Sequence, residues 1–243
     1  MSFLWRDVAP LVSAARPARR ARAHALNPAQ NHSLARRQVL AGLALGTALA
    51  AASGRANRAL AADAADGPKQ FVDTLAGKAI AVMSDTAGSE GTRVEQFRAL
   101  FDVSFDLPAI GQLVLGRHWK SATPEQQKQF LDLFEQQEVL IWARRFKSYN
   151  GEKLVVESAS ADPATPSRFR VDSRIDKTGG QPIPLEWLVV QAAGGWRIVD
   201  VTIENASMAL TLRQDFESVL QSNGGKIDAL LAAMQKKIDQ LKA

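Results

Sequence analysis

The stretch that decides the fold is RFRVDSRID at residues 168–176. Its side chains alternate: the odd-numbered positions carry phenylalanine, valine, serine and isoleucine, and the even-numbered positions carry arginine or aspartate. Such alternation is typical of an antiparallel β-strand that turns one face to a core and the other to water. We therefore predict a half-buried strand here.

Three further runs of β-type sequence lie on either side of this stretch. They cover residues 154–161, 183–192 and 196–204, and turn-forming residues separate the runs, at Asp162-Pro163, Thr178-Gly179-Gly180 and Gly194-Gly195. Strands joined by such short turns pair with their neighbours in the chain. The sequence therefore predicts a four-stranded antiparallel meander.

Helical patterns precede and follow the strands. Apolar residues recur at helical spacing in residues 71–83 and 92–105, after a short linker of Asp, Ala and Gly, and further helices are expected over residues 110–115, 123–149, 208–221 and 226–241. The long helix begins with Thr123-Pro124-Glu125-Gln126, a capping box with proline at the first helical position. Helices grouped around a run of strands favour an α+β fold, with helices packed on one face of a curved antiparallel four-stranded sheet.

The first 61 residues have the features of an export signal. Arg36 and Arg37 precede the apolar stretch 39–52, which is shorter than the roughly 18 residues that span a bilayer, and the small-residue site Ala59-Leu60-Ala61 follows. The paired arginines resemble a twin-arginine signal, although Ala35 stands where such signals usually have Ser or Thr; the general export route is the alternative. We expect cleavage near Ala61 to Ala64, and a periplasmic protein whose residues 62–243 form a single domain.

The export signal also accounts for the basic composition of the whole chain. Removing its nine arginines and one aspartate from 30 basic and 25 acidic residues leaves 21 and 24, a formal net charge of −3. Nucleic acids and anionic membranes attract proteins with a basic excess, which the mature chain lacks. We therefore expect no nucleic-acid partner.

The mature chain contains few of the residues and motifs that catalysis usually requires. His118 is its one histidine, cysteine is absent, and the sequence contains neither a phosphate-binding loop nor a nucleophile elbow. We expect no catalytic residue, no metal and no cofactor. The alternative is a small cone-shaped α+β enzyme that uses Asp102 or Asp106 with His118 on an apolar substrate. In the simpler interpretation, Asp106 caps the following helix and His118 lies in a polar turn.

Large apolar side chains are abundant on the long helix, before it and on the strands. They line either a closed core, as in an exported interaction module, or a cavity for an apolar ligand, and periodicity alone does not separate the two. The candidates for ligand contact are Phe105, Ile110, Val114, Trp119, Phe130, Phe134, Ile141, Phe169, Val171, Ile175, Leu185, Trp187, Val189 and Ile198.

Two sets of charged residues on the strands have simpler roles. Arg168, Arg170 and Arg174 alternate with aspartates, which indicates a solvated strand face rather than a headgroup site. Asp200, between two valines of the last strand, is expected to make a structural hydrogen bond or salt bridge.

Several short segments, in their order and spacing, resemble a known family. They are Phe101-Asp102, Phe105-Asp106, Leu115-Gly116-Arg117-His118-Trp119, the segment 123–130, Tyr149-Asn150-Gly151, Gly195-Trp196-Arg197-Ile198-Val199-Asp200-Val201, Glu204-Asn205-Ala206-Ser207 and Leu212-Arg213-Gln214-Asp215-Phe216. Over about residues 68 to 240 the chain resembles the MlaC or toluene-tolerance family of periplasmic phospholipid-binding proteins.

The resemblance implies an apolar cavity between helices and sheet, lined by the candidates named above. It also implies a lipid carrier that holds a phospholipid, or a hopanoid, by its apolar part. Such a carrier exchanges lipid with an inner-membrane MCE-domain transporter complex and an outer-membrane lipoprotein complex.

Overall fold

The computed structural model of the protein describes residues 47–85, 87–146, 149–163, 165–177 and 179–243. They form seven helices and five strands, with the helices grouped before and after the strands as predicted. Residues 1–46 of the predicted export signal lie outside the described residues. Residues 47–61, its remaining part, belong to the first described helix.

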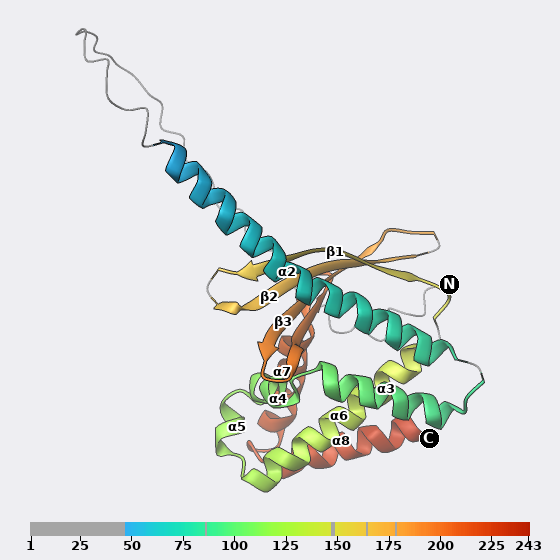
Figure 1. Cartoon of the computed structure of the whole chain (residues 1–243). Coiled ribbons are helices and arrows are strands. Elements are labelled where there is room, and N and C mark those ends of the chain that lie inside the picture. Colours follow the sequence, from blue (N-terminus) through green and yellow to red (C-terminus); the bar gives the residue numbers. More distant parts are fainter. Residues whose placement is uncertain (1–46, 86, 147–148, 164, 178) are drawn as a thin grey trace, which may run out of the picture.

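The four predicted strands form one antiparallel sheet in chain order (Figure 1). They are β1 (Lys153–Asp162), β2 (Thr165–Asp176), β3 (Ile183–Ala192) and β4 (Gly195–Ile203), and a two-residue strand, β5 (Ala206–Ser207), extends the sheet beside β4. In β2, Phe169, Val171 and Ser173 are buried, which confirms the alternation in residues 168–176.

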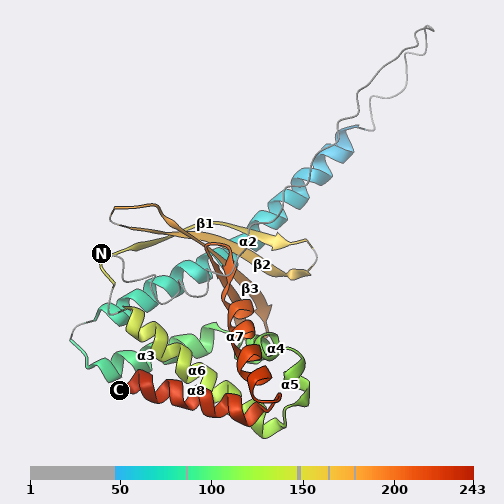
Figure 2. The same cartoon turned by 180° about the vertical axis from the view of Figure 1, so that it is seen from behind.

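Irregular pairing curves the sheet. Leu188 pairs with Asp200, but the next residue, Val189, pairs with Ile198, so Val199 is an extra residue in β4. Two further irregularities interrupt the pairing of β1 with β2. Bulges of this kind bend a strand and increase its twist, and the sheet in Figures 1 and 2 is accordingly curved and unclosed.

The helices, with the bounds that the structure gives them, are α2 (Thr47–Ser84), α3 (Glu90–Ser104), α4 (Leu107–Leu115), α5 (Arg117–Ser121), α6 (Pro124–Phe146), α7 (Met208–Ser222) and α8 (Ile227–Lys242). The capping box before α6 is confirmed, because the N–H of Gln126 donates to Thr123 Oγ1 (3.2 Å) and the N–H of Thr123 donates to Gln126 Oε1 (3.0 Å). Asp106 caps α4 by accepting from the N–H of Ala109 (3.0 Å), also as predicted.

Two local expectations were wrong. The Asp/Ala/Gly linker before Phe71 is part of α2, which starts in an alanine-rich stretch that favours a helix and continues through Gly67 and Pro68. His118 lies in the short helix α5 rather than in a turn. Gly116, with φ of 52°, ends α4 and lets the chain begin this extra helical turn.

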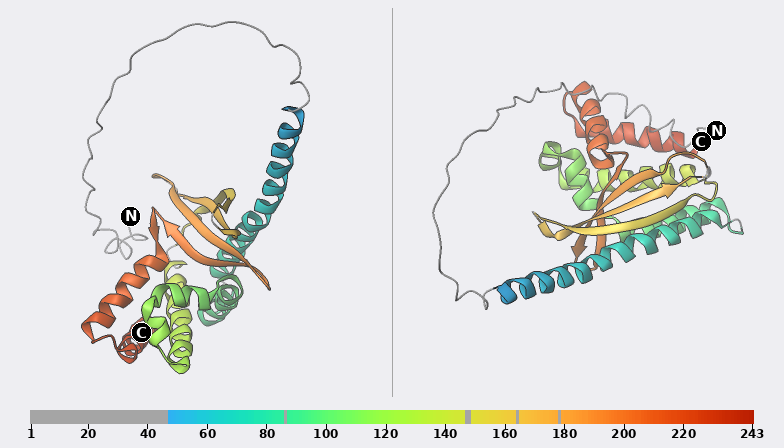
Figure 3. Two further views of the ribbon diagram at one scale, coloured as in Figure 1. Left: turned by 90° about the vertical axis from the view of Figure 1, so that its left-hand side faces the viewer. Right: turned by 90° about the horizontal axis from the view of Figure 1, so that it is seen from above.

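Different helices contact the two sides of the strand order, one near β1 and three near β4. α2 contacts β1 and β2, while α3, α4 and α7 contact β4, and α6 packs on α8 away from the sheet (Figure 3). Buried apolar residues therefore gather in separate clusters: one among α4, α6, α7 and α8, one between α2 and the sheet, and one among α2, α3 and α6. Among the described residues, no helix is both long and apolar enough to cross a membrane.

Candidate functional site

An apolar pocket with a volume of about 300 Å³ lies where these clusters meet. Its walls come from the sheet and from α2, α3, α4, α6 and α7. The volume is at the lower end of the range of pockets that bind small molecules. The curved sheet and the helices thus enclose an interior space that their own side chains do not fill.

Helices α2 and α3 contribute only apolar side chains to the pocket. The α2 residues are Leu75, Ala76, Ala79 and Ile80, and the α3 residues are Phe97, Leu100 and Phe101. Their spacing of three or four residues places them on one face of each helix. This face is the one that the sequence predicts to be apolar, so the same periodicity that makes the helices pack also makes them line the pocket.

Phe105 is held at the pocket by the connection between α3 and α4. The N–H of Asp106 donates to the carbonyl of Ile198 (2.9 Å), which ties the connection to β4. The ring of Phe105 stacks on that of Phe101, with centroids 4.4 Å apart. Phe105 is thereby fixed by the backbone on one side and by an aromatic neighbour on the other.

The sheet provides the opposite wall. Its lining residues are Leu154, Ile175, Ile183, Leu185, Trp187, Val199, Asp200, Val201 and Ile203. Three consecutive residues of β4, from 199 to 201, line the pocket, although neighbours in a regular strand point to opposite faces. The bulge at Val199 explains this exception. Trp187 is oriented by its indole N–H, which donates to Ser173 Oγ (2.8 Å).

Asp200 is a polar lining residue, and both oxygen atoms of its carboxylate accept hydrogen bonds from neighbouring elements. Its Oδ1 accepts from the N–H groups of Val201 (2.8 Å) and Ala209 (3.0 Å), and its Oδ2 accepts from Ser207 Oγ (2.5 Å). Ser207 in turn caps α7 by accepting from the N–H of Leu210 (3.1 Å). The predicted structural role of Asp200 is thus confirmed by contacts that join β4, β5 and the start of α7.

Replacing Asp200 with alanine is expected to lower the free energy of unfolding by about 2 kcal/mol, since three acceptor contacts are lost and two buried N–H groups lose a partner. Urea denaturation measures the loss. Asp200→Asn keeps one carbonyl oxygen in the same place and should lose less than half as much. Equal stability of the alanine variant and the wild type would contradict the structural role.

Helix α6 presents a mixed face to the pocket. Phe134, Glu138, Trp142, Arg145 and Phe146 follow one another at helical spacing and all line the pocket. Glu138 is 6% exposed and Phe134 is 2% exposed. The guanidinium of Arg145 lies over the indole of Trp142, 4.9 Å from the ring centroid, which is a cation–π arrangement.

Glu138 is electrostatically unusual. Burial raises the pKa of its carboxyl from 4.5 to about 7, although the charge of Arg145 and a hydrogen bond with Gln137 oppose the increase. Its Oε1 atom is buried and has no hydrogen-bond partner among the described residues. A carboxyl with this pKa is mostly neutral below pH 7 and is about half ionised at pH 7.

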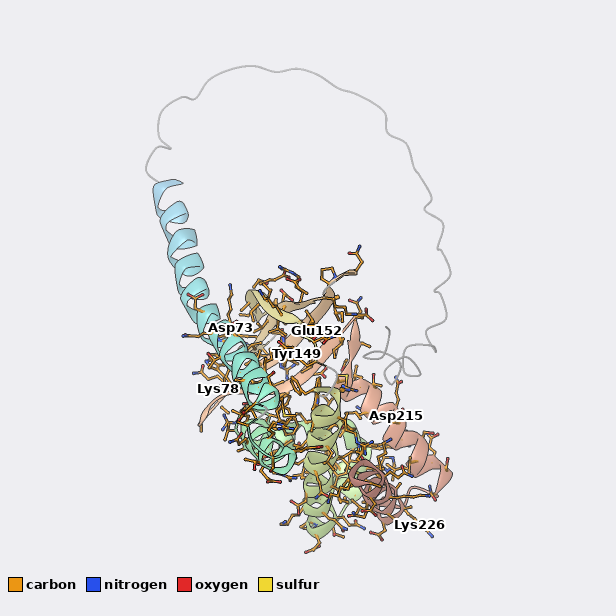
Figure 4. The ribbon with its side chains drawn as sticks, turned by 90° about the vertical axis from the view of Figure 1, so that its right-hand side faces the viewer. Asp73, Lys78, Tyr149, Glu152, Asp215 and Lys226 are labelled. Carbon is orange, nitrogen blue, oxygen red and sulfur yellow. The ribbon has the colours of Figure 1, made fainter. Side chains whose placement is uncertain are left out.

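The other polar lining residues lie near one end of the sheet. Tyr149 and Glu152 belong to the segment between α6 and β1, and both are labelled in Figure 4. Lys153 pairs with Asp176, so Glu152 and the lining residue Lys177 flank the same end of the β1–β2 pair. Charged groups therefore gather at this end of the pocket, whereas α2 and α3 supply none.

The structure distributes the fourteen candidate residues between the pocket and the core. Six of them line the pocket: Phe105, Ile110, Phe134, Ile175, Leu185 and Trp187. Seven lie away from its surface and pack in or against the core, namely Val114, Trp119, Phe130, Phe169, Val171, Val189 and Ile198. Ile141 is half-buried on α6, outside the pocket. As ligand contacts, all fourteen stay a prediction.

Sequence reasoning missed much of the helical lining. Leu75, Ala79, Phe97 and Phe101 were visible as an apolar stripe, but nothing in the pattern marked them as cavity residues rather than core. The stripe that begins at Phe134 contained a usable signal. Four residues on, a glutamate interrupts the apolar positions, and a charge on a buried helical face is a recognised sign of a functional residue.

The acid/base alternative finds no support in the geometry. Within the described residues, none of Asp102, Asp106 and His118 lines the pocket. Asp102 is exposed on α3, Asp106 caps α4, and the Nε2 atom of His118 lies 3.0 Å from a carboxylate oxygen of Glu217 on α7. In this described part of the chain, no cluster of three metal-ligating side chains occurs either.

The charged strand face is solvated as predicted for two of its arginines. Arg170 pairs with Glu186 (3.4 Å), and Arg174 pairs with Asp176 (2.8 Å) and with Glu157. These pairs are partly exposed and do not line the pocket. Exposed pairs of this kind add little to stability, so they give no sign of a headgroup site.

Two of the sequence segments that carry the family resemblance meet at the junction of α4 and α5. A Cβ atom at Gly116 would lie 2.6 Å from the guanidinium of Arg213 on α7, which would have to move, and the φ of 52° also favours glycine here. Arg117, in the next position, pairs with Glu217 of the same helix (2.5 Å). These contacts join α7 to the junction of α4 and α5, and the four residues do not line the pocket.

Comparison with known proteins gives two findings. A family model described as MlaC protein matches residues 73–236 of this chain. A solved structure of a phospholipid-binding protein from Ralstonia solanacearum, in complex with a phospholipid, is similar in fold, with a TM-score of 0.64 and 23% sequence identity. That likeness covers 72% of this chain and 98% of the other.

Proposed function

Because this chain belongs to the MlaC family, we propose that its apolar pocket holds the tails of a lipid and that the protein carries this lipid through the periplasm. The observation that supports the proposal is the pocket, whose walls are apolar on α2, on α3 and over most of the sheet. The structural neighbour that binds a phospholipid has the same fold, which makes a phospholipid the first candidate ligand.

The proposed contacts with the lipid tails are the apolar lining residues. They include the six sequence candidates in the pocket, Phe105, Ile110, Phe134, Ile175, Leu185 and Trp187, together with the apolar residues of α2 and α3. Charged groups near Glu152 and Lys177 mark the end where a polar headgroup would find water and partners for hydrogen bonds.

A carrier is needed because a free lipid crosses water at a high cost. Each buried CH₂ is worth roughly 0.8 kcal/mol, so two tails of about sixteen carbons face on the order of 20 kcal/mol in water. An apolar pocket removes this barrier, but it offers the tails little gain over a membrane. Loading and release therefore require partner complexes that bias the exchange.

For these partners we propose an inner-membrane MCE-domain transporter complex and an outer-membrane lipoprotein complex. The predicted export signal, residues 1–61, supports a periplasmic location for the mature domain. A hopanoid is the second candidate ligand. Its rigid rings would lie against the same apolar walls.

We expect the protein to retain lipid during purification. The test is to express residues 65–243 in a bacterial periplasm, purify the chain without detergent, and identify bound lipid by native mass spectrometry and organic extraction. Phospholipid or hopanoid at close to one molecule per chain is the expected result. A chain that is purified without lipid and takes none from phospholipid vesicles would contradict the proposed function.

A further inference from the structure

Glu138 is a buried polar residue in the lining of the pocket, and within the described part of the chain its Oε1 atom makes no hydrogen bond that would stabilise the fold. It lies on α6 between Phe134 and Trp142, is 6% exposed and lines the pocket. Asp200, a half-buried carboxylate of the lining, accepts three hydrogen bonds from β4, β5 and α7. Glu138 differs, because its Oε1 has no hydrogen-bond partner among the described residues.

An unsatisfied polar atom inside an apolar pocket is unfavourable once water has been displaced from it. Acyl chains cannot replace the hydrogen bond that water would make. A lipid that places an oxygen atom beside Glu138 can replace it, because a neutral carboxyl group has an O–H donor in addition to its acceptor capacity. The free energy of binding is therefore more favourable for a lipid that places an oxygen beside Glu138 than for a lipid that presents only hydrocarbon there.

We propose that Glu138 is a hydrogen-bonding subsite within the pocket, at which its carboxyl group donates to a neutral oxygen of the bound lipid, an ester carbonyl or a hydroxyl. This inference rests on the proposed function and adds a determinant of lipid specificity to it. The subsite selects among lipids by the oxygen near their apolar part, independently of the headgroup.

The surroundings of Glu138 suit a neutral rather than an ionised group. The lining residues of α2 and α3 are all apolar, and the charged groups of the pocket are Arg145 on α6, Glu152 before β1, Lys177 after β2 and Asp200 on β4. Burial of Glu138 outweighs the charge of Arg145 and raises its pKa to about 7. A bound lipid excludes more water from the carboxyl, so lipid binding is expected to be coupled to proton uptake and to weaken as the pH rises above 7.

The experiment compares lipids that differ only in the oxygen. Delipidated protein is mixed with vesicles that contain either a diester phosphatidylglycerol or the diether analogue, which lacks the ester carbonyls, and bound lipid is measured at pH 6 and pH 8. A second pair, a triterpenoid alcohol and its parent hydrocarbon, tests the hydroxyl as the source of the oxygen. The proteins are the wild type, Glu138→Gln, Glu138→Met and, as a control at an exposed carboxylate outside the pocket, Glu95→Gln.

At pH 6 the wild type should favour the oxygen-bearing member of at least one pair by roughly three- to tenfold, the range of a single hydrogen bond. Glu138→Gln should keep the preference at both pH values, because an amide donates without titrating. Glu138→Met should bind lipid without the preference, and Glu95→Gln should behave as the wild type. The subsite is refuted if the wild type shows no preference in either pair, or if Glu138→Met retains it. Failure of every variant and of the wild type to bind lipid would instead refute the proposed function.

Discussion

Glutamate in place of Ala76 should empty the pocket, with lipid retained after purification falling by at least about tenfold. Ala76 is a half-buried lining residue on α2. In the empty pocket a carboxylate at this position is hydrated, so the fold tolerates it. In the filled pocket the same carboxylate must lie against acyl chains without a partner. The lipid-to-protein ratio, measured by native mass spectrometry, gives the result.

The matched control is the next residue of the same helix. Gly77 is exposed, and a Cβ atom added there meets nothing within 4 Å. Gly77→Glu introduces the same charge on the outer face of α2 and should retain lipid as the wild type does, with a small gain in helix stability. If both variants lose lipid equally, the added charge acts through something other than the pocket. The proposal that α2 contacts the bound lipid would then be wrong.

Glu138→Gln is expected to stabilise the delipidated protein by about 3 kcal/mol relative to the wild type at pH 8, and to have little effect near pH 4. The folded protein holds the carboxyl proton more tightly than the unfolded chain does, because the pKa is about 7 in the fold and 4.5 without burial. The stabilisation from the neutral carboxyl is therefore fully present below pH 4.5 and is lost as the pH rises through 7. Glutamine removes this dependence because it does not titrate.

Urea denaturation of both proteins between pH 4 and pH 8 measures the difference, which should widen steadily over this interval. Glu95→Gln is the control, since the Glu95 side chain is 69% exposed and pairs with Arg98 only at the surface. Its effect should stay within a few tenths of a kcal/mol at every pH. A wild type that is as stable as Glu138→Gln at pH 8 would show that the carboxyl of Glu138 is solvated in the folded protein.

Much of the fold follows from local pattern. The alternation in residues 168–176 predicts β2 and its buried face, and the capping box at Thr123 predicts the start of α6. Errors arose where two local preferences compete. The alanines before Gly67 extend α2 through the expected linker, and Gly116 permits an additional helical turn, α5, that no periodicity marks.

The pocket could be predicted only in part, because burial and cavity lining leave the same mark on a sequence. Phe130 and Phe134 lie four residues apart on α6 and both are buried, yet only Phe134 lines the pocket. The difference depends on tertiary packing, because the ring of Phe130 meets that of Phe216 on α7, with centroids 5.7 Å apart. The β4 wall of the pocket likewise depends on the register shift at Val199, which is a property of the pairing between β3 and β4 and not of either strand alone.

The hydrogen bonds of Asp200 restrict how the lipid range of this protein can be altered by design. Its side chain faces the pocket and also connects β4, β5 and the start of α7. A library of substitutions on the β4 wall would therefore lose folded variants before it explored new ligands. Variation is better placed at Ala76 and Ile80 on α2 and at Trp142 on α6, which line the pocket without hydrogen bonds of this kind to other described residues, so that substitutions there change the ligand-facing wall and leave the connection between β4, β5 and α7 intact.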